Sequence, residues 1–370
     1  MNIGIPTEIK SQEHRVSMIP ATVSELTKKG HHIFVQQGAG MSSSYSDEQY
    51  IAAGAQILET AKEVFEHAQL IVKVKEPQPA EIDLLNEQHI LFTYLHLAAN
   101  KTLTESILAS GCTAIAYETI EVHGHLPLLE PMSEIAGRMS AIVGSYHLAK
   151  HNNGRGILLG GVPGVARGRV VVIGGGTAGV NAARVAKGIG ADVTILEVDF
   201  KRMRFLDITM EGIQTLYSTE ANLSELLVRA DLVIGAILLP GAAAPKLITR
   251  DMLKLMQPGS VFVDIAVDQG GCSETTRATT HELPTFIEEG VVHYCVANMP
   301  AAYARTATQA LNNVTHSWIT LIADLGLKAA TEKRPELLKG INCFDNRLTC
   351  EAVARSHQLE YQSAQELLTP

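Results

Sequence analysis

Residues 169–179 read Arg169-Val170-Val171-Val172-Ile173-Gly174-Gly175-Gly176-Thr177-Ala178-Gly179. The apolar, β-branched half of this stretch predicts a buried strand, and the glycine-rich half predicts a sharp turn into a helix. A second β-rich run, residues 192–196, ends at the acidic Glu197, which lies 21 residues after Gly176. This order of strand, glycine turn, helix, strand and acid is typical of a dinucleotide-binding unit.

Three glycines of the turn have separate physical tasks. Gly174 lets the chain turn sharply out of the strand, and Gly176 lets the backbone approach a pyrophosphate closely because it has no Cβ. Gly179 lets the following helix pack closely on the sheet. That helix, expected over residues 180–188, directs the positive end of its dipole toward the phosphates. A dinucleotide is therefore the expected class of cofactor.

Glu197 indicates which dinucleotide binds. A carboxylate at this position accepts hydrogen bonds from the ribose diol of NAD and repels the 2′-phosphate of NADP. Lys201, Arg202 and Arg204 follow it closely and could instead attract a phosphate. The acid favours NAD, and the neighbouring cations leave NADP open as the alternative.

The composition of the chain bounds its class. Its 370 residues are 46% hydrophobic and 19% charged, which suits a globular protein of two or three domains. The net charge of −9 argues against a nucleic-acid or anionic-membrane partner. The cysteines form no CxxC pair and the N-terminus does not resemble a signal peptide, so we expect a cytoplasmic protein. No histidine pair has a nearby third ligand, so we expect no metal site.

Strand-like and helix-like stretches alternate along the chain, which is the pattern of parallel βαβ units. Early strands are expected at residues 3–6, 32–36, 69–74, 90–95 and 113–118, and helices at 21–29, 47–53, 60–67 and 103–110. Later strands are expected at 231–236, 260–265 and 291–296, with long helices at 133–151 and 307–325. The expected fold class is α/β, with two doubly wound, Rossmann-like domains of mainly parallel sheets joined by long helices.

We expect one of the two domains to be discontinuous. Residues 131–305 contain the glycine motif and form the expected NAD-binding Rossmann domain. The roughly 65 residues that follow are too few to form a core of their own. Residues 1–130 and 306–370 together therefore form the expected substrate-binding and catalytic domain.

Ligands of open α/β sheets bind beyond the carboxyl ends of the strands. Arg15, Lys75 and His96 follow expected strands of the first sheet, and Asp268 and Asn298 follow expected strands of the second. Facing sheet edges would bring these side chains to one cleft. Two cations, a histidine and a carboxylate suit a small anionic substrate that is oxidised beside a nicotinamide.

Each of these residues also has an ordinary structural explanation. Arg15 and Lys75 could be solvated loop charges, and His96 could be a hydrogen-bonded core histidine. Asp268 is followed by a glutamine and two glycines, so it could be a simple turn residue. Their joint placement at strand ends is what favours a site over these alternatives.

Long strings along the chain are shared with a known family. They are Pro6-Thr7-Glu8-Ile9-Lys10, Glu13-His14-Arg15-Val16, Val74-Lys75-Glu76-Pro77, Tyr94-Leu95-His96-Leu97-Ala98, Pro131-Met132-Ser133-Glu134-Ile135-Ala136-Gly137-Arg138, Asp264-Ile265-Ala266-Val267-Asp268-Gln269-Gly270-Gly271-Cys272 and Val296-Ala297-Asn298-Met299-Pro300. These strings resemble those of the alanine dehydrogenases and the related transhydrogenase α subunits. The resemblance implies an NAD-dependent enzyme that converts L-alanine reversibly to pyruvate and ammonia. It also implies a homo-oligomer, which is a hexamer in most members.

The resemblance assigns roles residue by residue. It implies that Arg15, Lys75 and Asn298 bind the substrate, and that His96 and Asp268 form the acid/base pair. It implies cofactor contacts at Ser133, Gly174, Gly176, Thr177, Ala178, Gly179, Glu197, Arg202, Ser218, Ile237, Leu238, Ile265, Val267, Asp268, Arg277, Val296, Asn298 and Met299. The family usually has aspartate at position 197, and the sequence from Asn298 to Arg305 departs from the more usual Gly-Ala-Val-Pro-Arg continuation.

Two other functions stay open. A transhydrogenase α-type subunit would pass hydride from NADH to a nicotinamide on a partner, and a non-catalytic protein would bind NAD without turnover. Lys75, His96 and Asp268 favour an enzyme with its own small substrate. NADH oxidation that depends on pyruvate and ammonia would separate these possibilities.

Overall fold

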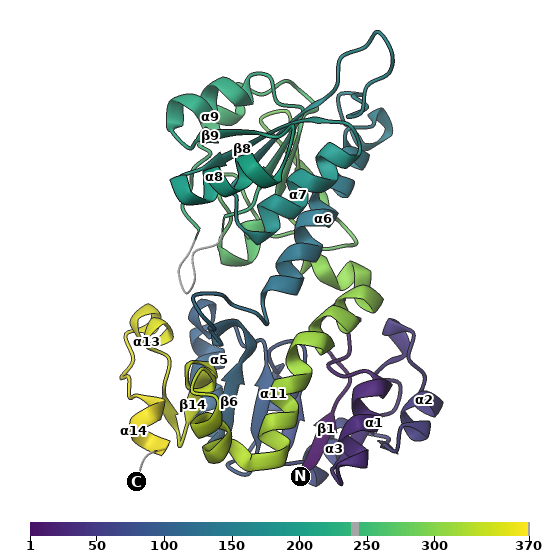
Figure 1. Cartoon of the computed structure of the whole chain (residues 1–370), viewed down its shortest axis with the longest axis vertical. Helices are drawn as coiled ribbons and strands as arrows, with labels where there is room; N and C mark the ends of the chain where they lie inside the picture. Colours follow the sequence, from purple (N-terminus) through teal and green to yellow (C-terminus); the bar gives the residue numbers. More distant parts are fainter. Residues whose placement is uncertain (238–243, 369–370) are drawn as a thin grey trace. The chain divides into compact units, whose positions relative to one another are not determined.

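The structure of the protein is a computed structural model that describes residues 1–237 and 244–368 (Figure 1). The chain forms two compact units. Unit 1 comprises Met1–Met132 and Ala301–Pro370, and unit 2 comprises Ser133–Pro300. Helix α6 (Glu130–His147) contains the first boundary, and helix α11 (Ala304–Lys333) begins shortly after the second.

Unit 1 is built on a mixed sheet with the strand order β15-β14-β6-β5-β4-β1-β2-β3. Its central strands are parallel, whereas β14 is antiparallel to both β6 and β15. The order of the chain reverses between β1 and β4, so this pair is the topological switch point of the sheet. The strands are β1 (Asn2–Ile5), β2 (His32–Gln36), β3 (Gln56–Leu58), β4 (Leu70–Val72), β5 (Ile90–Thr93), β6 (Thr113–Ala116), β14 (Ile341–Phe344) and β15 (Arg347–Leu348).

The helices of unit 1 begin where the sequence supplies start signals. Pro20 occupies the first turn of α1, where a missing N–H costs nothing. The Thr60 hydroxyl accepts the backbone N–H of Glu63 and the Glu63 carboxylate accepts the backbone N–H of Thr60, which forms a capping box at α3. Figure 1 shows the long helix α11 within unit 1, where it contacts α1. The helices are α1 (Pro20–Lys28), α2 (Asp47–Ala52), α3 (Ala61–His67), α4 (Pro79–Ile82), α5 (Lys101–Ser110), α11, α12 (Leu337–Gly340), α13 (Glu351–His357) and α14 (Ala364–Leu368).

Unit 2 is built on a sheet with the order β12-β13-β11-β10-β7-β8-β9, in which only β12 is antiparallel among the described strands. Its switch point lies between β7 and β10. The strands are β7 (Arg169–Ile173), β8 (Asp192–Glu197), β9 (Gln214–Tyr217), β10 (Leu232–Gly235), β11 (Val261–Asp264), β12 (Thr285–Glu288) and β13 (Val291–Tyr294). The helices are α7 (Thr177–Gly188), α8 (Phe200–Thr209), α9 (Glu220–Leu227) and α10 (Arg250–Leu253), together with most of α6.

Strand β7 shows why its sequence is a continuous apolar run. Val170 and Val172 belong to a core cluster with the alanines of α7, whereas Val171 and Ile173 belong to a second cluster with residues of α9 and α10. Alternate side chains of a strand point to opposite faces, so a sheet covered on both faces needs apolar residues at every position. The fold class predicted from the alternating strands and helices is confirmed by this architecture.

Several predicted helix boundaries were wrong: α5 begins at Lys101 rather than at residue 103, α6 begins at Glu130 rather than at residue 133, and α11 spans Ala304–Lys333 rather than 307–325. Helix α6 ends at His147 rather than at residue 151, because the chain folds back on the helix end there. A Cβ on Gly154 would lie 2.2 Å from the carbonyl oxygen of His147, so the return path requires glycine. Helix α7 begins at Thr177 rather than at residue 180, with Gly176 as its N-cap. None of the helices in the described ranges combines the length and the apolar character needed to cross a bilayer.

Candidate active site

The predicted site residues of unit 1 follow three neighbouring strands. Arg15 lies in the loop after β1, Lys75 follows β4, and His96 follows β5. These strands are adjacent in the sheet and parallel, so their carboxyl ends meet at one edge, beside the switch point. The structure therefore brings these three residues of unit 1 to a common edge.

Arg15 is a buried cation with a carboxylate partner. Its side chain is only 2% exposed, and its Nε and Nη2 atoms donate to the two carboxylate oxygens of Glu13, each at 2.6 Å. Its Nη1 atom lies 3.0 Å from the Sδ atom of Met132. The bidentate pair fixes the plane of the guanidinium. Glu13 was not predicted, although its position two residues before Arg15 was a signal for such a pair.

Lys75 and His96 form a direct polar pair. The Nζ atom of Lys75 lies 3.3 Å from the Nε2 atom of His96. Lys75 is 6% exposed, and His96 is half-buried with its ring stacked on Tyr94 at a centroid distance of 6.0 Å. Because an ammonium group has donors only, His96 Nε2 acts as the acceptor in this contact when the lysine is charged.

The electrostatic surroundings keep the His96 imidazole neutral. Burial lowers the pKa of His96 well below its ordinary value near 6.5, and the positive charges of Lys75, Lys10 and Arg15 lower it further. Both effects disfavour the imidazolium form. A neutral imidazole at neutral pH can accept a proton, which is the state that a general base requires.

A buried charge cluster holds the loop that carries Lys75. Lys73 is fully buried and its Nζ atom donates to Glu8 at 3.0 Å and to Glu81 at 2.6 Å. Burial alone would lower the pKa of Lys73, but the two carboxylates outweigh it and raise that pKa. The Glu8 carboxylate also accepts the backbone N–H of Val74 at 2.6 Å and of Lys75 at 3.4 Å. The cluster therefore fixes the backbone at Lys75, and the sequence did not reveal it.

In unit 2, the glycine turn has the geometry that its sequence predicts. Gly174 has a φ of 101°, in the left-handed region that favours glycine. A Cβ on Gly179 would lie 1.8 Å from the carbonyl oxygen of Gly174, so the helix packs too closely for any side chain there. A Cβ on Gly176 would meet no atom within 4 Å. Space is therefore open at Gly176, beside the N-terminus of α7, where a phosphate could approach the backbone.

Glu197 lies at the end of β8 and folds its carboxylate onto the backbone. One oxygen accepts the N–H of Gly175 at 2.8 Å, and the other accepts those of Val198 at 2.7 Å and Asp199 at 3.0 Å. The Nε atom of Arg202 donates to the Gly175 carbonyl at 2.6 Å. The acid and the cation thus both hold the glycine turn. A carboxylate offers about four acceptor positions, so about one of them is left for a ribose hydroxyl.

Asp268 and Asn298 follow the neighbouring strands β11 and β13 of unit 2. Asp268 is exposed in the 3-10 helix Ile265–Gln269, and its Oδ2 atom lies 3.4 Å from the backbone nitrogen of Asn298. Asn298 has a φ of 62°, a left-handed conformation that asparagine tolerates better than most residues. The turn itself is held by the buried Asp264, which accepts the N–H of Ala266 at 3.0 Å and of Cys272 at 2.9 Å. Asp264 was not predicted.

Most of the other predicted cofactor residues of unit 2 lie after its parallel strands or in the turns beside them. Ser218 follows β9 and donates its backbone N–H to Glu197 O at 2.9 Å, and Ile237 follows β10. Arg277 lies over the ring of Phe286 at 4.1 Å. Three residues of this set have buried side chains and could contact a ligand only through their backbone atoms; they are Val267, Val296 and Met299. The remaining members are Ser133 in α6, Thr177 and Ala178 in the first turn of α7, and Ile265 at the start of the 3-10 helix, while Leu238 lies outside the described residues.

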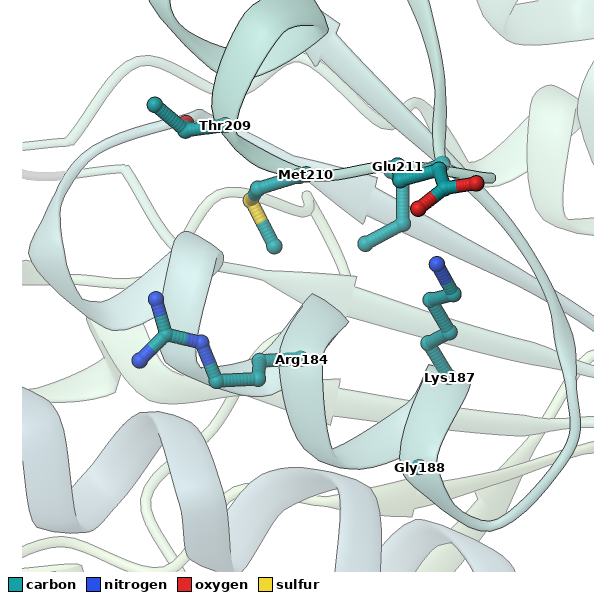
Figure 2. A pocket seen from close by; sticks show the side chains of 7 residues that line it. Arg184, Lys187, Gly188, Thr209, Met210 and Glu211 are labelled. Carbon is teal, nitrogen blue, oxygen red and sulfur yellow. The ribbon is translucent and has the colours of Figure 1, made fainter.

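A separate pocket in unit 2 lies away from these residues. It is lined by Arg184, Lys187, Gly188, Thr209, Met210, Glu211 and Ile213, and Figure 2 shows the two basic side chains and Glu211 around it. Its residues come from the C-terminal end of α7 and from the segment that leads into β9. The glycine turn lies at the opposite end of α7, so this pocket is not the candidate site. Within residues 1–237 and 244–368, no group of three histidine, cysteine or acidic residues is arranged to hold a metal ion.

Comparisons with known proteins place the chain in a family. The family model "Alanine dehydrogenase/PNT, N-terminal domain" matches residues 4–136, and "Alanine dehydrogenase/PNT, C-terminal domain" matches residues 140–351. The chain belongs to this family. Its strings around Arg15, Lys75, His96 and Asp268, which resembled the alanine dehydrogenases, all lie within the matched ranges.

Curated relatives and solved structures match the chain over nearly its whole length. An alanine dehydrogenase of Methanococcus maripaludis is 51% identical over 371 residues, and one of Mycolicibacterium smegmatis is 52% identical over 370 residues; both alignments cover 100% of each chain. A solved L-alanine dehydrogenase has a TM-score of 0.92 and 47% identity, and the match covers 97% of this chain and 99% of that one. A transhydrogenase from Sinorhizobium meliloti, at 24% identity and a TM-score of 0.81, shares the fold.

Proposed function

We propose that this protein is an NAD-dependent L-alanine dehydrogenase, which oxidises L-alanine to pyruvate and ammonia and catalyses the reverse reductive amination. The observation that carries the proposal is the Lys75–His96 contact of 3.3 Å, at a strand edge shared with Arg15. It occurs in a chain that is 51% identical, end to end, to a named alanine dehydrogenase. One line of support is local geometry, and the other is sequence similarity over the whole chain.

The glycine turn supports NAD as the cofactor. The open space at Gly176 and the N-terminus of α7 fit a pyrophosphate, and the acid at the end of β8 fits a ribose diol. When bound, NAD would accept the hydride that leaves Cα of alanine. Because Glu197 already accepts three backbone N–H groups, we propose that it makes a single contact to the diol and that it disfavours the 2′-phosphate of NADP by its charge.

Arg15 and Lys75 supply the positive charge that a small carboxylic acid needs. We propose that Arg15 binds the substrate carboxylate and that Lys75 polarises the keto oxygen of pyruvate. Glu13 holds the Nε and Nη2 edge of the Arg15 guanidinium, so the substrate would meet this group from the Nη1 side. The ammonium of Lys75 is close enough to His96 for one small substrate to contact both side chains.

His96 would move the protons of the reaction. The amine must be neutral before hydride can leave Cα, because an ammonium group has no lone pair to stabilise the iminium that forms. Water then adds to the iminium, and ammonia departs after proton transfer. The lowered pKa of His96 keeps its imidazole neutral, so it could take the proton that the amine or the attacking water loses.

Asp268 would complete the acid/base pair. Its carboxylate is exposed, and it lies at the edge of the unit 2 sheet that also carries the glycine turn. We propose that this negative charge stabilises the iminium and orients the attacking water, with Asn298 as a neighbouring substrate contact. The backbone N–H of Asn298 helps to hold the carboxylate in place.

Initial rates test the proposal directly. We expect NAD reduction that depends on L-alanine, a much lower rate with NADP, and NADH oxidation that requires both pyruvate and ammonia. Binding of NADH without any of these reactions would identify a non-catalytic NAD-binding protein. Hydride exchange between nicotinamides without alanine turnover would identify a transhydrogenase subunit.

The proposed partners are small molecules and further copies of the chain. L-Alanine, pyruvate and ammonia are the proposed substrates, and the family resemblance suggests a homohexamer. The cysteine pattern favours the cytoplasm. Light scattering of the purified protein tests the oligomeric state independently of activity.

A further inference from the structure

The backbone at His96 adopts a conformation that residues other than glycine rarely adopt. Its φ is 52° and its ψ is 33°, which is the left-handed helical region. A residue with a Cβ is strained there and keeps this conformation only where its surroundings enforce it. Something in the structure must therefore hold His96 in place.

The carboxylate of Glu118 makes the contacts that enforce this conformation. Its Oε1 atom accepts the backbone N–H of His96 at 2.6 Å and of Leu95 at 3.0 Å, while Oε2 lies 3.2 Å from the Leu95 nitrogen. Hydrogen bonds to an ionised acceptor are stronger than neutral ones. One side chain thus binds two consecutive amides of the strained loop.

The sheet explains why Glu118 reaches this loop. Glu118 belongs to the 3-10 helix Tyr117–Thr119, which directly follows β6, and His96 follows the neighbouring parallel strand β5. Both segments therefore leave the same edge of the sheet. Glu118 is half-buried, and burial raises its pKa above the ordinary value; the amides of His96 and Leu95 and the charge of Lys75 reduce this rise without reversing it.

We propose that Glu118 is a positioning residue for the proton transfers of His96. By binding the amides of Leu95 and His96, it holds the strained turn that directs the imidazole toward Lys75 Nζ. Its hydrogen bonds are to the backbone N–H groups of His96 and Leu95, so its role is to orient the base rather than to exchange protons with the substrate. This inference rests on the proposed function, because it assigns a role within the same site.

Three variants test this role. Glu118→Ala removes both acceptors, whereas Glu118→Gln keeps one oxygen for the His96 amide in a side chain of the same shape. Glu121→Gln is the matched control, because Glu121 lies nearby in sequence but pairs with Lys339 at 2.8 Å on the surface. Melting temperature and NADH affinity establish for each variant that the protein is folded.

The first readout is hydrogen exchange of the peptide that contains Leu95 and His96, followed by mass spectrometry in the full chain. We expect exchange at least about tenfold faster in Glu118→Ala, an intermediate rate in Glu118→Gln, and no change in Glu121→Gln. Wild-type exchange in Glu118→Ala would overturn the proposal, because the contact would then not hold the loop.

The second readout is the kinetics of alanine oxidation. Misplacement of a catalytic group by about 1 Å can lower turnover about a hundredfold, so we expect Glu118→Ala to lose about that factor in kcat. Its KM for alanine should change by less than about threefold, because Arg15 and Lys75 remain, and Glu118→Gln should recover most of the loss. A general loss of structure would instead lower NADH affinity as well, and unchanged kcat in Glu118→Ala would overturn the inference. Absence of alanine turnover in the wild type would overturn the proposed function, while hydrogen exchange would still test the contact.

Discussion

Alanine at two glycines of the glycine motif should weaken NADH binding in both cases but lower stability in only one. In Gly179→Ala, the new Cβ would lie 1.8 Å from the Gly174 carbonyl oxygen, which is much shorter than a van der Waals contact. The helix or the turn must then shift, and overpacking of this kind costs about 1–3 kcal/mol or more. We expect Gly179→Ala to lower the free energy of unfolding by at least that amount and to abolish NADH binding.

Gly176→Ala should leave the fold intact and weaken binding alone. Its φ of −70° suits alanine, and the new Cβ meets no atom within 4 Å. Alanine is a poorer N-cap than glycine, but it also restricts the unfolded chain, and these opposing effects leave a net change below about 1 kcal/mol. The methyl group would displace the pyrophosphate, and the loss of one charge-assisted hydrogen bond, about 1.5–3 kcal/mol, corresponds to a loss of affinity of about 10- to 100-fold.

Urea unfolding and NADH fluorescence titration of the two variants, beside the wild type, measure both quantities. The expected pattern is lost stability in Gly179→Ala and lost affinity without lost stability in Gly176→Ala. Wild-type NADH affinity in Gly176→Ala would refute the reasoning, because the dinucleotide would then not approach this part of the backbone.

Three further predictions concern unit 1. His96→Ala should lower alanine turnover by at least about a hundredfold while NADH binding survives, and steady-state rates with parallel titrations check this. Lys73→Met should lower the free energy of unfolding by about 3–5 kcal/mol in urea, because Glu8 and Glu81 lose their buried counter-charge; Lys62→Met, which breaks an exposed pair with Glu66, should change it by less than about 0.5 kcal/mol. The folded protein holds the pKa of His96 well below 6.5, whereas the unfolded chain protonates this histidine near pH 6.5. The free energy of unfolding therefore falls as the pH drops from about 6.5 toward the pKa of His96 in the folded protein. Melting curves at pH 7.5 and 5.5 should therefore show a smaller acid loss in His96→Gln than in the wild type.

The sequence predicted those parts of the fold that local chemistry determines. The strand, glycine turn and helix from Arg169 onward follow from β-branched residues and from glycines whose close contacts no other residue permits. The strand predicted at residues 32–36 is β2 itself. Short strands near or at the sheet edges were missed, among them β3 and β12, because so few residues carry too little periodic signal to separate them from loops.

The supporting groups of the candidate site could not be predicted, because they are brought together by tertiary structure. Glu118 meets His96 only because β5 and β6 are neighbours, and Glu8 meets Lys73 across a separation of 65 residues. The rule about strand carboxyl ends could select Arg15, Lys75 and His96, since it uses sequence order alone. It could not show that Glu13 already binds the Arg15 guanidinium.

Transfer of the α-hydrogen is the measurement that tests the central claim most directly. The protein is incubated with NAD and L-alanine that carries deuterium at Cα, and the mass of the reduced cofactor is measured by mass spectrometry. The proposed chemistry predicts NADH that contains one deuterium, formed in step with pyruvate. Unlabelled NADH, or no reduced cofactor at all, would contradict direct hydride transfer from alanine to NAD.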